Sequence, residues 1–207
     1  MSQKRGRFIV FEGIDGSGKT TQARLLADKL RVEGREVFLT AEPTAYPSGV
    51  ALREALGGKI KKTECQMAVM FVEDRIVHNI YPETGIRALL ERGVDVICDR
   101  YYYSTLAYQG ESTDYAWVKA MNLLCPEIAR PDVCIYVDLL PKQSLERISK
   151  GRDSVEIYEN IETLTAVREK FLFVINDLSA ADNVKTVDGY RSVEDVSADI
   201  YAIVNEI

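Results

Sequence analysis

The sequence is poor in the residues that build metal centres and disulfide frameworks. Among its 207 residues are one histidine, one tryptophan and four cysteines. The cysteines form no C-x-x-C pair and have no histidine cluster beside them, which argues against zinc and redox motifs. Cys98 and Cys134 lie in apolar, strand-like runs, where buried free thiols are expected. These features favour a reducing compartment, and we expect a cytoplasmic protein.

Long apolar runs and an excess of positive charge are missing as well. No apolar stretch reaches the roughly 20 residues that a membrane-spanning helix needs, and no secretory signal is recognised at the start. The formal net charge of −6 argues against a broad surface for nucleic acid, but is compatible with a local basic site for phosphate. We expect neither a membrane nor a nucleic-acid partner.

The remaining composition is that of an ordinary globular chain. Hydrophobic residues make up 46% of the sequence, and its length fits one α/β domain with an ample core. No internal repeat, low-complexity segment or interdomain linker is recognisable. We therefore expect a single domain over residues 1–207.

Strand-like and helix-like segments alternate along the chain. Apolar runs predict five strands, at residues 8–11, 36–40, 94–99, 133–138 and 184–187. Helical periodicity predicts helices at residues 20–32, 48–56, 63–92, 113–125, 141–150, 158–180 and 192–207. This alternation predicts a parallel sheet covered by helices on both faces.

Two features modify this pattern of elements. Thr63 and Gln66 have the spacing of a capping box at the start of the long helix, and Pro82 is expected to kink or split that helix. The segment after the third strand is expected to be a loop.

The most informative segment follows the first strand. Residues 13–20 match G-x-x-x-x-G-K-[ST], the phosphate-binding P-loop. Its glycines let the backbone turn sharply and bring N–H groups against phosphate oxygens. Lys19 supplies charge for the outer phosphates, Thr20 offers a hydroxyl to Mg²⁺, and the positive end of the next helix faces the phosphates.

Two strands end in aspartate, and either residue could complete a magnesium site with Thr20. Ligands of open α/β sheets bind at the carboxyl ends of the strands, where Asp99 and Asp138 both lie. Asp99 is favoured because Arg100 follows it, and an acid for Mg²⁺ beside a guanidinium for phosphate suits phosphoryl transfer. Asp138 precedes a predicted helix at Pro141, and its alternative role is to cap that helix.

The ordered set of motifs resembles the thymidylate kinases, a family of P-loop nucleoside monophosphate kinases. The matching segments span almost the whole chain, at residues 11–21, 42–44, 71–75, 99–110 and 188–196. The resemblance implies the three-layer P-loop NTPase fold, with a five-stranded parallel sheet and a short lid at about residues 147–159. It also implies transfer of a phosphoryl group from Mg²⁺-bound ATP to dTMP, giving dTDP for dTTP and DNA synthesis.

On the ATP side, the resemblance implies contacts from the P-loop and from the helix after the fourth strand. The implied ATP-binding residues are Gly13, Asp15, Gly16, Ser17, Gly18, Lys19, Thr20, Thr21 and Arg147. The implied catalytic residues are Lys19, Arg100, Asp15 and a basic lid residue, for which Arg152 is preferred to Lys150 because of its bidentate fork. The alternative for the lid pair is a solvated basic patch at a helix end.

On the dTMP side, the resemblance implies one pocket formed by the long helix and the loop after the third strand. The implied contacts are Asp15, Glu42, Phe71, Arg75, Arg100, Ser104, Thr105 and Tyr108. Phe71 would stack on the pyrimidine, Arg75 would donate to thymine O4, and Arg100 would hold the monophosphate. Phe71 could instead pack in the core beside Met67 and Met70, and Arg75 could form a surface ion pair with Asp74 or Glu73.

The roles of several further residues have more than one interpretation. Ala41 stands where many relatives have arginine before Glu-Pro, and Arg53 or Tyr46 could compensate. Relatives are homodimers, and Ala68, Val69, Val72 and Ile76 could supply either that interface or core. His78 is read as structural or surface. The rival functions are another phosphotransferase, such as a deoxynucleoside kinase with Glu12 or Glu42 as base, and a non-catalytic nucleotide-binding module.

Overall fold

The computed structural model describes residues 4–151 and 161–207, and its centre is a five-stranded parallel sheet. The strand order is β2-β3-β1-β4-β5, which confirms the predicted parallel α/β architecture. The strands are β1 (Phe8–Glu12), β2 (Val37–Ala41), β3 (Asp95–Asp99), β4 (Val133–Asp138) and β5 (Val184–Asp188).

The strand β1 lies in the middle of the sheet because its first four residues, 8–11, are apolar on both faces. It pairs with β3 on one side and β4 on the other, and all five of its residues are buried. Phe11 pairs with Asp99 and Glu12 with Tyr136, so the end of β1 lies beside the ends of its two neighbours. Whatever follows β1 therefore lies at the centre of the carboxyl edge of the sheet.

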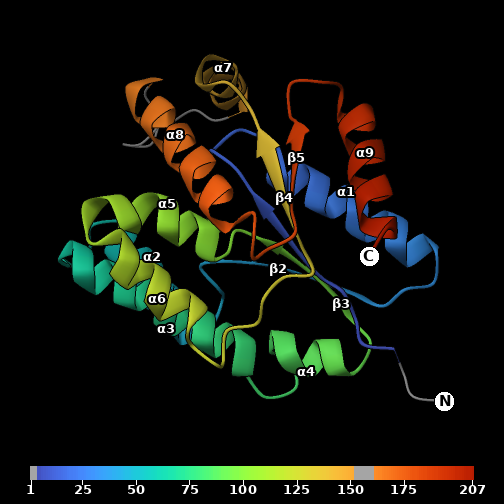
Figure 1. Ribbon diagram of the computed structural model, residues 1–207, viewed down its shortest axis with the longest axis horizontal. Coiled ribbons are helices and arrows are strands. Elements are labelled where there is room, and N and C mark those ends of the chain that lie inside the picture. The colour runs from blue at the N-terminus through green and yellow to red at the C-terminus, as the bar shows by residue number, and fades with distance from the viewer. Residues whose placement is uncertain (1–3, 152–160) are drawn as a thin grey trace.

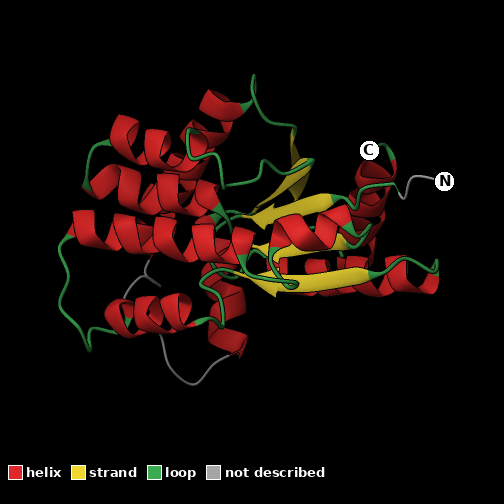
Figure 2. Ribbon diagram, turned by 90° about the horizontal axis from the view of Figure 1, so that it is seen from below, coloured by secondary structure: helices red, strands yellow, loops and turns green. Residues whose placement is uncertain are grey.

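Helices cover both faces of the sheet (Figures 1 and 2). The helix α1 (Lys19–Val32) and the helix α9 (Val193–Asn205) cover one face, where they pack on Ile9 and Phe11. The other face packs Phe8 and Val10 against a larger group of helices. The remaining helices are α2 (Pro47–Leu56), α3 (Glu64–Ile80), α4 (Ile86–Glu91), α5 (Tyr102–Ser112), α6 (Tyr115–Leu123), α7 (Pro141–Gly151) and α8 (Ile161–Leu178).

The predicted long helix of residues 63–92 is two helices. The capping box at its start is confirmed, since Thr63 accepts from the backbone N–H of Gln66 and the Gln66 side chain accepts from that of Thr63. Pro82 has no N–H to donate and disfavours helical geometry at Tyr81, which is extended with ψ at 132°. The chain therefore leaves α3 at Ile80 and starts α4 only at Ile86.

The segment after β3 is a helix, α5, and the prediction of a loop there was wrong. No side chain of the N-cap residue Tyr101 closes this helix. Instead the buried carboxylate of Glu12 accepts from the backbone N–H of Tyr101 at 2.7 Å and of Ser104 at 3.1 Å. A carboxylate at a helix N-terminus satisfies donors that the helix cannot satisfy itself. Because it comes from a distant strand, local sequence gives no sign of it.

The apolar face of α3 belongs mainly to the core. Ala68 and Val72 are buried, and Ile76 packs partly buried against the same core. Val69 is 47% exposed and is the member of this set that α3 presents outward.

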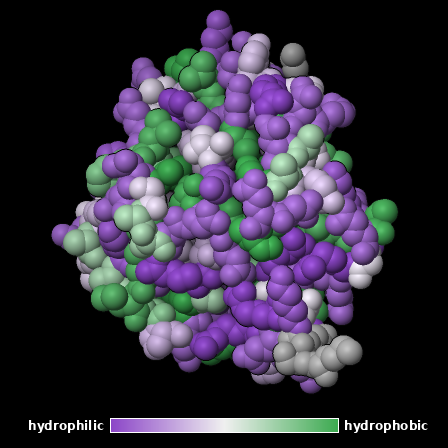
Figure 3. All heavy atoms as spheres, turned by 45° about the vertical axis from the view of Figure 1, so that its right-hand side comes forward, coloured by the Kyte–Doolittle hydropathy of each residue, from purple (hydrophilic) through white to green (hydrophobic). Residues whose placement is uncertain are grey.

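Hydrophilic residues cover most of the face drawn in Figure 3, with hydrophobic residues between them. Among the described residues, no helix combines the length and the apolar character that crossing a membrane requires.

Candidate active site

The P-loop joins β1 to α1, in the strand–loop–helix order that its function requires. Gly13, Gly16 and Gly18 have φ angles of 144°, 74° and 100°, which residues with a Cβ atom rarely adopt. A Cβ atom on Gly13 would also lie 2.6 Å from the carbonyl oxygen of Val137. The loop thus depends on glycine both for its turns and for its close approach to β4.

A cavity of about 580 Å³, the P-loop cavity, opens over this loop and the first turn of α1. Arg147 reaches it from α7, where its guanidinium donates to the carbonyl oxygens of Gly189 at 2.8 Å and Ser17 at 3.4 Å. The structure gathers here eight of the nine residues predicted to bind ATP, and Gly13 is the exception. The eight are Asp15, Gly16, Ser17, Gly18, Lys19, Thr20, Thr21 and Arg147.

Lys19 is buried at the floor of the P-loop cavity. Its Nζ donates to the carbonyl oxygen of Ile14 at 2.9 Å, across the loop. Burial, and next the positive charge of Arg100, lower the pKa of Lys19 to about 8, although Asp99, Asp15 and Glu12 oppose the shift. An anion bound over the loop would supply the countercharge that this ammonium group lacks.

Thr20 and Asp99 are brought together as the sequence predicts. The Thr20 hydroxyl donates to Oδ2 of Asp99, while Oδ1 of Asp99 is buried and has no hydrogen-bond partner in the described part of the chain. An unpartnered carboxylate oxygen beside a hydroxyl fits Mg²⁺, which is bound by one or two carboxylates, waters and substrate phosphates. Among the described residues there is no cluster of three or more His, Cys, Asp or Glu side chains that could hold a metal ion.

The other candidate, Asp138, has a different partner. It pairs with Nε of Arg168 on α8 at 2.7 Å. Unlike Asp99, it is not among the residues that line the P-loop cavity.

Arg100 occupies the turn between β3 and α5 and has the left-handed φ of 71°. A non-glycine residue rarely adopts this conformation, and such strain clusters at functional sites. Its guanidinium donates to Asp15 in the P-loop and, at 3.0 Å, to the Ser104 hydroxyl. Burial alone would lower the pKa of Arg100, but Tyr108 and the carboxylates of Asp15, Glu12 and Asp99 raise it above its ordinary value, so this cation stays charged.

A second cavity, the α3–α5 cavity, has a volume of about 390 Å³ and lies between these two helices. All eight residues predicted to contact dTMP line it: Asp15, Glu42, Phe71, Arg75, Arg100, Ser104, Thr105 and Tyr108. Asp15 and Arg100 line the P-loop cavity as well, so the two cavities meet at this ion pair. The site therefore has the shape needed to hold two ligands with their near ends at one point.

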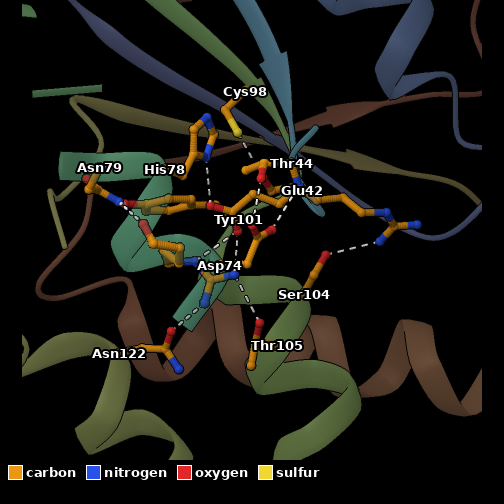
Figure 4. Close-up of polar contacts among 12 residues, drawn as sticks. Glu42, Thr44, Asp74, His78, Asn79, Cys98, Tyr101, Ser104, Thr105 and Asn122 are labelled. Carbon is orange, nitrogen blue, oxygen red and sulfur yellow. Dashed lines mark hydrogen bonds and ion pairs between the residues drawn. The ribbon is translucent and has the colours of Figure 1, made fainter. Parts of the chain in front are cut away.

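A buried polar network that includes Glu42, Thr105 and Asn122 lies at the wall of the α3–α5 cavity (Figure 4). Arg75 joins these three residues through hydrogen bonds. Arg75 is 1% exposed, so the alternative of a surface ion pair with Asp74 or Glu73 is wrong. Its Nε and Nη2 donate to one oxygen of Glu42, at 2.9 and 2.6 Å, and Nη2 also donates to Thr105. Nη1 donates to Asn122 on α6. The guanidinium is thus held from α5, α6 and the end of β2 at once.

Comparison with known proteins decides the family. The profile of the thymidylate kinases matches residues 11–200. The chain is 39% identical to a probable thymidylate kinase of Pyrococcus horikoshii, over 97% of this chain and 96% of that protein. It is 41% identical to one of Methanococcus aeolicus, over 83% and 80%, and 38% identical to one of Pyrococcus abyssi, over 97% and 96%.

The chain belongs to the thymidylate kinase family. It is therefore an enzyme of the nucleoside monophosphate kinase type, and the resemblance inferred from its motifs is confirmed.

Several residues whose roles the sequence leaves undecided have defined surroundings in the structure. His78 is buried, with ring nitrogens 3.0 Å from Glu42 and 2.9 Å from the Thr40 hydroxyl, so it is structural and not a surface residue. Arg53 donates to the carbonyl oxygen of Pro43, and Tyr46 stacks on Tyr81. Neither Arg53 nor Tyr46 lines the cavity that holds the predicted dTMP contacts.

The sequence analysis missed Gln109, which lines the α3–α5 cavity, and Asn122, which holds Arg75 from outside the cavity. Gln109 lines the α3–α5 cavity, and its Oε1 is buried with no hydrogen-bond partner in the described part of the chain. It lies four residues after Thr105, hence on the same face of α5. That spacing is informative only if residues 102–112 are recognised as a helix. Asn122 gives no local signal, because its partner Arg75 is 47 residues away.

The predicted lid, at about residues 147–159, lies only partly within the described residues. The helix α7 carries its first part, including Arg147, to Gly151. Arg152, the preferred catalytic residue of the lid, lies outside the described residues, as does the side chain of Lys150.

The low pKa of Lys19 predicts how nucleotide binding depends on pH. In the free enzyme Lys19 loses its proton near pH 8, whereas bound phosphates favour the charged form and raise its pKa. The affinity for Mg²⁺-ADP should therefore be constant below pH 8 and fall by up to about tenfold per pH unit above it.

Calorimetric titration at several pH values measures this slope and the accompanying proton uptake. A Lys19→Arg control, which does not titrate in this range, should bind without the slope. Undiminished wild-type affinity well above pH 8 would contradict the prediction.

Proposed function

We propose that this enzyme transfers the γ-phosphoryl group of ATP to dTMP, giving ADP and dTDP for dTTP and DNA synthesis. The observation that carries the proposal is the meeting of two cavities at Asp15 and Arg100. ATP would occupy the P-loop cavity and dTMP the α3–α5 cavity, with their phosphates converging at this ion pair. Holding two reactants end to end supplies much of the rate enhancement of such a transfer.

The chemistry needs charge neutralisation more than proton removal. The acceptor is already a phosphate anion, so no strong general base is required. Lys19 would neutralise the outer phosphates of ATP, and Arg100 would hold the monophosphate of dTMP in its planar fork. Asp15 would orient Arg100 and approach the sugar hydroxyl of dTMP or the metal shell. Mg²⁺, held by Thr20 and Asp99, would neutralise phosphate charge, and a basic lid residue, Arg152 in preference to Lys150, would complete the set.

The base would be recognised in the α3–α5 cavity. Phe71 and Tyr108 border it with aromatic rings, and the Arg100 guanidinium carbon lies 5.9 Å from the centre of the Tyr108 ring. We infer that Phe71 stacks on the pyrimidine, Tyr108 packs against the deoxyribose, and Arg75 donates to thymine O4. Ser104 and Thr105 would add adaptable hydroxyl contacts at the base edge.

A deoxynucleoside kinase is disfavoured because its base candidates are already engaged. Such an enzyme needs a carboxylate that is free to take a proton from a 5′-hydroxyl group. Glu12 accepts hydrogen bonds from Tyr101 and Ser104, and Glu42 is paired with Arg75 and His78. Neither carboxylate is placed to act as that base.

We also propose that the enzyme acts in the cytoplasm as a homodimer, with no nucleic-acid or membrane partner. The four cysteines are free, which is typical of reducing compartments, and the net charge is −6. The homodimer rests on the family resemblance, and Val69 would belong to its interface.

The proposed function is tested by measuring ADP release from ATP with dTMP, dUMP, dCMP or thymidine as acceptor. Turnover should be greatest with dTMP and absent with thymidine. The Lys19→Ala variant lacks a main electrostatic contact, so its activity should be lower than that of the wild type by about 10²-fold or more. Because it is purified in the same way, any activity that remains also measures contaminating kinases. Turnover of thymidine, or of no acceptor at all, would refute the proposal.

Arg100 should not be replaceable by lysine. An ammonium group cannot reproduce the planar fork that would hold both phosphate oxygens and Asp15. We expect Arg100→Lys to raise the KM for dTMP and lower kcat by about tenfold or more. The matched control is Arg147→Lys, the same change at the far side of the P-loop cavity, which should affect the KM for ATP instead. If Arg100→Lys weakened ATP binding alone, Arg100 would belong to the ATP site.

The choice of base should depend on Arg75. Arginine only donates, and so does the amino group that cytosine carries in place of O4. An unmet buried donor costs about 1–3 kcal/mol, which predicts a strong wild-type preference for dTMP over dCMP. Arg75→Ala should narrow this ratio, chiefly by loss of dTMP activity, whereas the exposed Arg87→Ala should not. An unchanged ratio of kcat/KM values in Arg75→Ala would remove Arg75 from base recognition.

A further inference from the structure

Within the described part of the chain, one N–H of the Arg75 guanidinium group has no acceptor. Arginine carries five such donors. Four hydrogen bonds, to Glu42 from Nε and Nη2, to Thr105 from Nη2 and to Asn122 from Nη1, account for four of them. The fifth, on Nη1, has no acceptor among the described residues, and Arg75 lines the α3–α5 cavity. The direction of this last N–H is fixed by whatever holds Nη1.

Of the residues in the described ranges, Asn122 alone accepts a hydrogen bond from Nη1. Glu42 and Thr105 bind the other side of the guanidinium, at Nε and Nη2. A planar guanidinium held only at Nε and Nη2 could still rotate about the line through these two atoms. The hydrogen bond from Nη1 to Oδ1 of Asn122 removes this freedom, because it fixes a third corner of the planar group.

We propose that Asn122, on α6, is a positioning residue for base selection. It acts through Arg75 by turning the unused N–H of Nη1 toward the carbonyl oxygen of a pyrimidine in the α3–α5 cavity. The proposal rests on the proposed function, and it assigns part of the base specificity to a residue that does not line the cavity.

The surroundings of Asn122 suit this role better than that of charge compensation. The Arg75 charge is already balanced by Glu42, whose carboxylate is also buried. Asn122 is neutral and 1% exposed, and its Nδ2 donates to the carbonyl oxygen of Val118, one turn earlier in α6, at 2.9 Å. This bond fixes the orientation of the amide, because the flipped amide would direct a donor at Arg75. The side chain is therefore locked with its acceptor toward Nη1.

Two substitutions of similar size separate the acceptor from the rest of the side chain. Asn122→Leu and Asn122→Asp both lose the Nδ2 donor to Val118. Only Asn122→Asp keeps an oxygen that can accept from Nη1. A difference between the two variants therefore reports the contact with Arg75, and a loss common to both reports packing or the bond within α6. If Asn122→Leu does not fold, Asn122→Ala provides the variant without an acceptor.

The measurement is kcat/KM for dTMP and for dCMP, with the KM for ATP and the melting temperature of each variant. In Asn122→Leu we expect the ratio of dTMP to dCMP to fall by about tenfold or more, the effect of one buried hydrogen bond to a charged group. The KM for ATP should be unchanged. Asn122→Asp should keep a ratio close to that of the wild type.

Arg75→Ala provides the decisive background. If Asn122 acts through Arg75, adding Asn122→Leu to Arg75→Ala should not change the base ratio further. A wild-type ratio in Asn122→Leu, an equal loss in Asn122→Asp, or an additive loss in the double variant would each overturn the proposal. Failure of the proposed function would show in the wild type, as a lack of dTMP phosphorylation. Failure of the Asn122 proposal alone would leave the wild type active on dTMP and would show only in the variants.

Discussion

The buried carboxylate of Glu12 holds the two halves of the site together. It is the last residue of β1, directly before the P-loop, and it accepts hydrogen bonds from the backbone N–H groups of Tyr101 and Ser104 and from the Ser104 hydroxyl. Burial raises its pKa, whereas Arg100 and these hydrogen bonds act in the opposite direction. A central strand that ends in such an acceptor fixes the start of α5 relative to the P-loop.

Arg100 depends on this anchor. Its left-handed backbone carries strain of order 1–3 kcal/mol, which the surrounding structure has to offset. The backbone N–H of Arg100 donates to Phe11 at 2.9 Å, and the next N–H in the chain, that of Tyr101, donates to Glu12. The turn is thus pinned to β1 on both sides, and the guanidinium is directed at the junction of the two cavities. In this strained conformation, the Arg100 side chain lines both the P-loop cavity and the α3–α5 cavity.

The sequence predicted most of the fold, because most elements depend on local patterns. Apolar runs located the five strands, the capping box located the start of α3, and the glycine spacing located the P-loop. The errors came where distant groups decide local structure. The helix α5 has no cap in its own sequence and relies on Glu12, about 90 residues earlier. The break between α3 and α4 was foreseen at Pro82, but its length was not.

For the candidate site, the sequence predicted which residues line the α3–α5 cavity, but not which residues hold them in place. Every residue proposed to contact dTMP lines one cavity, because the motifs carry both the residue types and their order. What the motifs do not carry is how those residues are held. Asn122 and His78 touch Arg75 and Glu42 only after α3, α6 and β2 have packed, so spacing along the chain gives no sign of them.

The two cavities differ in their polar groups. Under the proposed function, this difference assigns specificity for the base to the α3–α5 cavity. The P-loop cavity is lined by the P-loop itself, by Lys19 and by Arg147, groups that would suit the phosphates of any nucleotide. In the α3–α5 cavity the charged pair of Arg75 and Glu42 is buried and almost fully hydrogen-bonded before any ligand arrives. A buried pair of this kind is weak evidence for stability, since apolar residues could fill the space as well. What the pair provides is a fixed direction for one donor. Four of the five N–H groups of Arg75 are engaged, so the guanidinium has one fixed N–H to offer a ligand. A ligand that cannot accept from this N–H leaves it without a hydrogen bond. Under the proposed function, discrimination between bases would therefore follow from how completely the described residues occupy the donors of Arg75, and not from the presence of arginine alone.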